Sequence, residues 1–137
     1  MASETATETG IEPARAAELI EAGADAIDVR RSEEWDAGRI VGARHIEINE
    51  LQGEAESIPK DRPVVFYCRS GSRSSLAAAA FRLAGWDAYN LEGGLNAWAS
   101  EGLALDPPDG KVPYQPWAAA LRLLADRAHI DPECFLF

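Results

Sequence analysis

Residues 64–84 read VVFYCRSGSRSSLAAAAFRLA, an apolar run followed by a polar segment and then an Ala-rich one. Val64–Tyr67 is a continuous run of β-branched and aromatic residues, typical of a strand buried on both faces within a parallel sheet. Residues 68–73 are polar and predict a loop, and the Ala-rich segment Ser74–Ala84 predicts a helix. The side chains of that helix that we expect to reach the core are Leu76, Ala80, Phe81 and Leu83.

The alternation of strand and helix patterns continues on both sides of this unit. Further strands are predicted from short apolar runs at Ala26–Val29, at His45–Ile48 on a sheet edge, and at Ala88–Leu91. Further helices are predicted at Pro13–Ala22, Ser32–Trp35, around Leu51, and at Leu95–Glu101. Strands and helices that alternate along a chain predict an α/β fold with a mostly parallel central sheet.

Composition shifts divide the chain into three regions. Residues 1–9 hold almost nothing to bury and predict a disordered tail, and residues 10–105 form the predicted domain. Residues 106–137 begin as a linker with four prolines and continue with an amphipathic helix. The apolar stripe of that helix is Trp117, Leu121, Leu124 and Ala128. We expect it to dock on the domain or on a partner subunit without supplying catalytic groups, because so short a helix needs packing.

Length and charge exclude several classes of function. The 137 residues fit one ordinary domain, and 13 Lys and Arg against 23 Asp and Glu give a net charge of −10, which disfavours nucleic-acid binding. No apolar run is long enough to span a membrane, and the N-terminus lacks the pattern of a secretory signal. Two cysteines, Cys68 and Cys134, are too few for a disulfide scaffold, and neither they nor the two histidines have zinc-ligand spacing. We therefore expect a cytoplasmic protein without a bound metal.

The polar loop after the central strand carries the chemistry. Cys68 lies at the carboxyl end of that strand, where ligands bind in open α/β sheets. The glycine and small hydroxyl residues that follow allow backbone N–H groups to turn inward and bind an anion. The next helix directs its N-terminus at the loop, and Arg69 and Arg73 add positive charge, so a thiolate at Cys68 is favoured. The alternative is that Cys68 is only a small buried core residue.

At this point the sequence resembles the rhodanese-like sulfurtransferases. Cys68–Arg73, CRSGSR, is similar to the six-residue active-site loop of that family. Asp28–Arg30 resembles its first motif, Gly38–Ala43 its G-H-I-P-G-A motif, and Leu91–Trp98 its E-G-G…W segment. Four such motifs in the family's order, within Gly10–Leu105, are a specific signal. In the second motif, GRIVGA replaces GHIPGA, which affects local structure more than the loop.

The resemblance implies a central sheet flanked by helices on both faces, and a reaction in which Cys68 carries a persulfide. The donor would be a small anion such as thiosulfate, and the acceptor a small thiol, a cyanide-like thiophile or a protein cysteine. The residues implied to bind the donor are Arg69, Ser70, Gly71, Ser72 and Arg73. Asp28 would support the loop backbone. Neither a metal nor an organic cofactor is implied, and the protein would act as a monomer or a homodimer.

Two other classes of function remain in view. Cysteine-based phosphatases and arsenate reductases have a similar loop with an arginine six positions after the cysteine, whereas Arg73 is five positions after Cys68 and Ser74 is sixth. The shorter loop suits one sulfur atom better than a tetrahedral phosphate. A non-enzymatic sulfur-binding or sensor module is the other alternative. Cys134 could resolve a persulfide or form a disulfide with Cys68, but we interpret it as a partly buried thiol on the appended segment, since nothing in the sequence places it over the loop.

Overall fold

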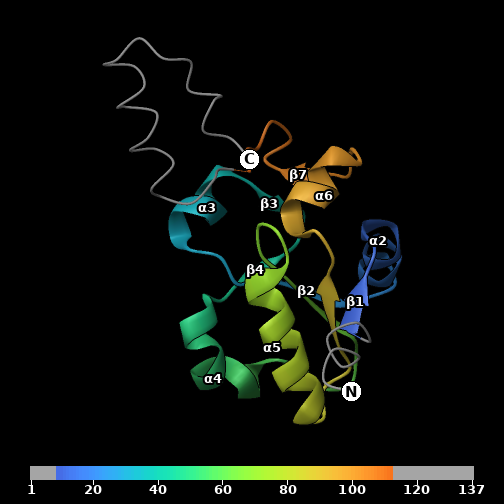
Figure 1. The fold of residues 1–137 in the computed structure, drawn as a ribbon, viewed down its shortest axis with the longest axis vertical. Coiled ribbons are helices and arrows are strands. Elements are labelled where there is room, and N and C mark those ends of the chain that lie inside the picture. The colour runs from blue at the N-terminus through green and yellow to red at the C-terminus, as the bar shows by residue number, and fades with distance from the viewer. Residues whose placement is uncertain (1–8, 113–137) are drawn as a thin grey trace.

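A five-stranded parallel sheet forms the centre of the molecule (Figure 1). The structure, a computed structural model, describes residues 9–112. The strands, in their order across the sheet, are β1 (Gly10–Ile11), β6 (Ala88–Leu91), β5 (Val64–Tyr67), β2 (Asp25–Asp28) and β4 (Arg44–His45). Every pairing in this sheet is parallel, so the predicted α/β fold is confirmed. All four residues of β5 are buried, as their continuous apolar run predicts.

Helices cover both faces of the sheet. On one face lie α4 (Leu51–Glu54) and α5 (Ser72–Leu83), and on the other α2 (Pro13–Glu21) and α6 (Gly94–Ser100). Side chains of β5 alternate between the two cores, with Phe66 and Cys68 facing α5 and Tyr67 facing α6. The thiol of Cys68 therefore lies on the α5 side of the sheet.

Short elements complete the described part of the chain. These are α3 (Ser32–Ala37), the 3₁₀ turns η1 (Ile48–Glu50) and η2 (Ala55–Ser57), and an antiparallel pair of β3 (Arg39–Ile40) and β7 (Leu105–Asp106). The pair with β3 brings Asp106 onto the domain, and the Lys111 N–H donates to the Ala37 carbonyl at 2.7 Å. The first residues of the segment predicted as a linker thus pack on the domain. Within residues 9–112 no helix has the length and apolar character needed to cross a membrane.

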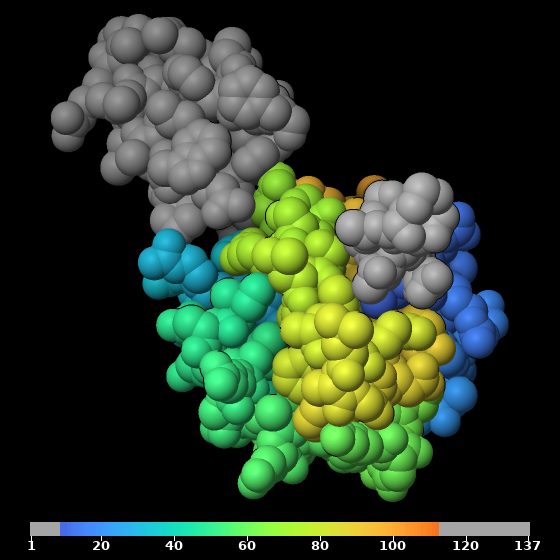
Figure 2. Space-filling model, turned by 60° about the horizontal axis from the view of Figure 1, so that its bottom comes forward, coloured from blue at the N-terminus to red at the C-terminus, as the bar shows by residue number. Residues whose placement is uncertain are grey.

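The rotation of α5 differs from the expected one. Leu76 and Leu83 are 71% and 84% exposed, so the prediction that they reach the core is wrong, and Ala80 is exposed as well. The buried residues of the helix are Ser74, Ala77, Ala78 and Phe81. The helix also begins at Ser72, two residues earlier than predicted. Ser74 must face Cys68 in the first turn, and this contact fixes which side of the helix meets the sheet. Figure 2 looks onto the face that carries α4 and α5.

Candidate active site

The loop after β5 closes around the sulfur of Cys68. Gly71 has φ of 102°, a left-handed conformation that glycine adopts without strain, and it reverses the chain at the start of α5. This turn places the Gly71 N–H 3.1 Å from Cys68 Sγ. The hydroxyl of Ser74, one turn further along, lies 3.4 Å from the same sulfur. The sulfur is therefore surrounded by hydrogen-bond donors.

The carbonyl groups of the loop point the other way, toward α6. The Leu95 N–H donates to the Cys68 carbonyl at 2.8 Å, and the Asn96 N–H donates to the Arg69 carbonyl at 3.0 Å. These contacts satisfy N–H groups of the first turn of α6 that have no partner within the helix. They also leave the loop's own N–H groups free to face the sulfur. The Gly93–Gly94 turn makes the approach possible, because a Cβ on Gly94 would lie 2.5 Å from the Cys68 carbonyl oxygen.

These donors favour the ionised form of Cys68. Burial of the side chain raises the pKa of the thiol, because a charge is costly away from water. Hydrogen bonds from the Ser74 hydroxyl and from the N–H groups of Ser74, Gly71 and Ser70 lower it. The hydrogen bonds prevail, and the pKa of Cys68 lies below its ordinary value. The arrangement can hold a thiolate, or an anionic sulfur attached to it.

Arg73 projects from the first turn of α5 and makes an ion pair with Glu34 of α3. Its Nη1 and Nη2 donate to the two carboxylate oxygens at 3.0 and 3.1 Å. The sequence predicted Arg73 as a cation beside the thiol and gave no partner for it. A positive charge on Arg73 and a negative charge on Glu34 therefore lie next to the loop. Glu34 is the buried partner, with 1% of its surface exposed.

The other predicted binding residues lie along the same loop. Arg69 is half-buried, while Ser70 and Ser72 are exposed. Cys68 itself has no exposed surface. The exposed serines mark the side of the loop that faces solvent.

Asp28, the predicted supporting residue, lies away from the thiol. Its neighbours along the chain, Ile27 in β2 and Val29 just after it, face α5 with Cys68, so the Asp28 side chain points to the opposite face. There its carboxylate accepts hydrogen bonds from the Arg30 N–H at 2.9 Å and from the Arg30 guanidinium at 2.7 Å. The Asp28 carboxylate also affects Tyr67. Burial is the larger cause and the negative charge of Asp28 the next, and together they raise the pKa of Tyr67 well above its ordinary value.

The Arg30 guanidinium also donates to the Gly38 carbonyl at 2.6 Å. Asp28 thus fixes a buried arginine that ties β2 to the end of α3. No described contact joins its carboxylate to the sulfur of Cys68.

Sequence reasoning missed three residues near the sulfur, namely Glu34, Ser74 and Asn90. The Ser74 hydroxyl lies within donor distance of two acceptors, Asn90 Oδ1 of β6 at 2.6 Å and the Cys68 sulfur at 3.4 Å, so Asn90 competes with the sulfur for its proton. A polar residue within the apolar strand AYNL was a usable signal for Asn90. Glu34 gave none, because a glutamate in the first turn of a short helix is ordinarily a surface residue. Cys134, His129 and the predicted C-terminal helix lie outside the described residues.

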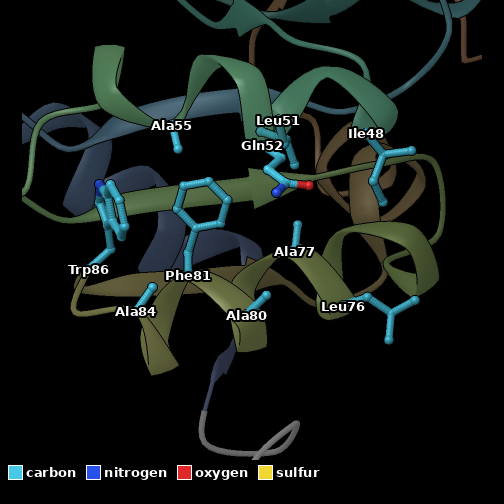
Figure 3. Close-up of a pocket in the computed structure, with 10 residues that line it drawn as sticks. All are labelled: Ile48, Leu51, Gln52, Ala55, Leu76, Ala77, Ala80, Phe81, Ala84 and Trp86. Carbon is cyan, nitrogen blue, oxygen red and sulfur yellow. The ribbon is translucent and has the colours of Figure 1, made fainter.

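A separate apolar groove runs between α4 and α5, with a volume of about 430 Å³ (Figure 3). Phe81 and Trp86 stand at one end of it and Ile48 at the other. None of its lining residues belongs to the loop 68–73. The groove is therefore distinct from the site around Cys68.

Comparison with known proteins agrees with this geometry. Residues 12–101 match the family described as rhodanese-like domain. The chain is 39% identical over 79 residues to YqhL of Bacillus subtilis, covering 57% of this chain and 63% of YqhL. It is 36% identical over 91 residues to the thiosulfate sulfurtransferase GlpE of Pseudomonas aeruginosa, covering 66% of this chain and 83% of GlpE.

A solved structure gives the same result at the level of the fold. The crystal structure of a rhodanese-related protein from Thermoplasma volcanium superposes with a TM-score of 0.66 and 29% identity, covering 70% of this chain and 95% of that one. The family match covers more than half of the sequence. It includes the central strands and the helices on both faces of the sheet. The chain belongs to the rhodanese-like domain family.

Proposed function

We propose that the protein is a sulfurtransferase that takes a sulfane sulfur from thiosulfate and passes it to a thiophilic acceptor through a persulfide on Cys68. The observation that carries the proposal is the set of donors around the sulfur, with the Gly71 N–H at 3.1 Å and the Ser74 hydroxyl at 3.4 Å. The name thiosulfate sulfurtransferase, borne by the relative from Pseudomonas aeruginosa, supports the choice of donor.

The first half of the reaction is a displacement at sulfur. The Cys68 thiolate attacks the outer sulfur of thiosulfate, a new S–S bond forms, and the bond to the sulfonate sulfur breaks. Sulfite leaves with the electron pair of that bond, and Cys68 becomes a persulfide anion. Because the pKa of Cys68 is lowered, the attacking thiolate is available without an adjacent general base.

The second half returns the enzyme to its starting state. A thiolate or a cyanide ion attacks the terminal sulfur, and Cys68 leaves as a thiolate. In both halves the backbone N–H groups of Ser70, Gly71 and Ser74 stabilise the negative sulfur, as in an oxyanion hole. Arg69 and Arg73 are proposed to bind the anionic donor and to stabilise the departing sulfite. The proposed reaction needs neither a metal nor an organic cofactor.

The spacing of the loop argues against phosphatase or arsenate reductase activity. Arg73 is five positions after Cys68, and α5 begins at Ser72. Ser74 occupies the sixth position, and its hydroxyl faces the sulfur. A phosphoryl group attached to Cys68 would need this space for its oxygen atoms, whereas a persulfide places a single sulfur atom there.

The test measures thiosulfate-dependent transfer to cyanide with purified Cys68→Ser, using Cys134→Ser as the matched control. Serine is nearly isosteric, but its hydroxyl is not ionised near neutral pH and cannot form a persulfide. We expect Cys68→Ser to lose transfer and Cys134→Ser to retain it. Appreciable turnover in folded Cys68→Ser, or no turnover in the wild-type protein, would overturn the proposed function.

A further inference from the structure

The carboxylate of Glu34 lies in a position that is costly for a charge. Glu34 belongs to α3, beside the N-terminal end of α5 (Figure 1), and its side chain is 2% exposed. A buried carboxylate is retained only when it is paired and hydrogen-bonded. Both of its oxygens are occupied by the Arg73 guanidinium at 3.0 and 3.1 Å. The Arg31 N–H, at 3.3 Å from Oε1, adds a contact within α3 itself.

This pairing restricts Arg73 more than it restricts Glu34. Glu34 sits in a short helix and is held by the start of its own turn, whereas Arg73 has a long flexible side chain that is 26% exposed. A two-pronged contact between guanidinium and carboxylate fixes the plane and direction of the guanidinium. The remaining N–H groups of Arg73 are then held in one orientation at the edge of the loop.

Arg73 also interacts with the thiol. The pKa of the Arg73 guanidinium is raised first by its hydrogen bonds to Glu34, against the opposing effect of burial, and further by the charge and hydrogen bonding of Cys68. The guanidinium is therefore hydrogen-bonded to a buried carboxylate from α3 and lies within electrostatic reach of the sulfur at the end of β5. The three groups come from positions 34, 68 and 73, so only the folded chain brings them together.

We propose that Glu34 is a positioning residue that holds the Arg73 guanidinium against the mouth of the Cys68 loop, where an anionic donor binds. The proposal rests on the proposed function for the identity of the donor. It differs from a simpler view, in which Glu34 only neutralises Arg73 and weakens anion binding. The two views predict opposite signs when the carboxylate is removed.

The test compares two alkylating reagents of similar size on the full-length protein. Iodoacetate carries a negative charge and iodoacetamide does not, and both react with the same thiolate. The ratio of their rates at Cys68 therefore reports the cation at the site without depending on the pKa of the thiol. Mass spectrometry of the Cys68 peptide separates this reaction from that of Cys134. The variants are Glu34→Gln, Glu34→Asp and Arg73→Gln, with Asp36→Asn as the control that removes an exposed charge from the same helix.

We expect the iodoacetate-to-iodoacetamide ratio to fall by roughly tenfold in Glu34→Gln, toward the value in Arg73→Gln, because a charge-assisted contact is worth about this factor. Glu34→Asp keeps the negative charge, but its shorter side chain moves the carboxylate away from the Arg73 guanidinium. The iodoacetate-to-iodoacetamide ratio should therefore fall in this variant too. In the Arg73→Gln background, Glu34→Gln should have no further effect. Asp36→Asn should leave the ratio unchanged.

A rise of the ratio in Glu34→Gln, or an unchanged ratio in folded Glu34→Asp, would overturn the positioning role. If Glu34→Gln does not fold, Glu34→Asp carries the decision alone. Alkylation does not require sulfur transfer, so the outcome stands even if thiosulfate is not the donor. Conversely, wild-type protein that shows the expected ratios without transferring sulfur would contradict the proposed function and leave the role of Glu34 intact.

Discussion

Two opposing effects set the reactivity of Cys68. The side chain has no exposed surface, which favours the neutral thiol, yet hydrogen bonds from the loop and from Ser74 favour the thiolate. Among the groups that lower the pKa, the Ser74 hydroxyl has the largest effect. The same hydroxyl lies 2.6 Å from Asn90 Oδ1 in β6, so the amide oxygen and the sulfur share its single proton. The reactivity of the thiol therefore depends on a neighbour that lies outside the loop 68–73.

Ser74→Ala should raise the pKa of Cys68. The rate of thiol alkylation follows the thiolate fraction, which rises with pH through the pKa of the thiol. Loss of the hydroxyl removes a donor to the thiolate, so the whole profile should move to higher pH, with a roughly tenfold lower rate near neutral pH. The measurement is the rate of iodoacetamide labelling of Cys68 as a function of pH.

The control for this prediction is Ser75→Ala. The Ser75 hydroxyl donates to the Ser72 carbonyl at 2.9 Å and does not contact the sulfur. Its removal should leave the alkylation profile in place. Identical profiles for Ser74→Ala and the wild-type protein would show that the hydroxyl does not act on the thiol.

The sequence could predict the residues of the loop but not their partners. Cys68 and Arg73 follow a buried strand and precede a helix, and that local order suffices to place them at the carboxyl edge of the sheet. Glu34 meets Arg73 only because the fold brings α3 to the N-terminal end of α5, a contact across 39 positions that no local pattern encodes. The same holds for Asp28, whose orientation depends on which face of β2 its neighbours occupy.

At the scale of the elements, the loop is held between the ends of α5 and α6. The Leu95 and Asn96 N–H groups fix its carbonyls, and the Gly93–Gly94 turn allows the two backbones to approach. This contact keeps the loop's own N–H groups directed at Cys68. The stability of the site is therefore expected to depend on a glycine outside the loop.

Gly94→Ala should destabilise the protein and impair sulfur transfer. Its φ of 60° is unfavourable for alanine by about 1–2 kcal/mol. In addition, the new Cβ would lie 2.5 Å from backbone atoms of Cys68 and Arg69, and relief of such crowding costs about 1–3 kcal/mol. Urea denaturation and transfer activity measure the two effects.

Gly102→Ala is the matched control for Gly94→Ala. Gly102 has φ of 76°, but nothing lies within 4 Å of a Cβ built there. This variant should be destabilised only by the cost of placing alanine at a positive φ, and it should transfer sulfur normally. Equal losses in the two variants would mean that the close approach of the turn to the loop has no energetic consequence.

The elements differ in how far the sequence could predict them. Val64–Tyr67 is apolar at every position and flanked by polar residues, so the central strand is predicted with its full length. The rotation of α5 could not be predicted, because leucines and alanines occur on every side of that helix. The contact between Ser74 and Cys68 fixes the rotation, and it turns Leu76 and Leu83 outward.

At the scale of the whole molecule, residues 106–112 pack on the domain although the sequence predicts that the domain ends at Leu105. Asp106 pairs with Arg39 in the β3–β7 ladder, and the Lys111 N–H donates a hydrogen bond to the Ala37 carbonyl at 2.7 Å. Val112 packs against the core beneath α6. These contacts tie the segment after Leu105 to α3, which carries Glu34.

Truncation at two points tests the importance of this segment. A chain that ends at Val112 retains every described contact and should transfer sulfur as well as the full chain does per folded molecule. A chain that ends at Leu105 loses the pairing of Asp106 with Arg39 and the hydrogen bond from Lys111 to the Ala37 carbonyl, and its free energy of unfolding should fall by about 1–3 kcal/mol. Thermal unfolding and transfer activity distinguish the two.

A folded but inactive chain ending at Val112 would mean that residues 113–137 supply part of the active site. That result would contradict the expectation that the C-terminal stripe contributes no catalytic group. Equal stability of the two truncated chains would show that residues 106–112 add nothing to the domain.

The proposed reaction requires that Cys68 carries the transferred sulfur. The most direct measurement is intact mass spectrometry of the protein after incubation with thiosulfate and removal of excess reagent, followed by peptide mapping. We predict a gain of the mass of one sulfur atom on Cys68, with none on Cys134, and loss of that mass after addition of cyanide. An unchanged mass, or a sulfur found only on Cys134, would contradict the account.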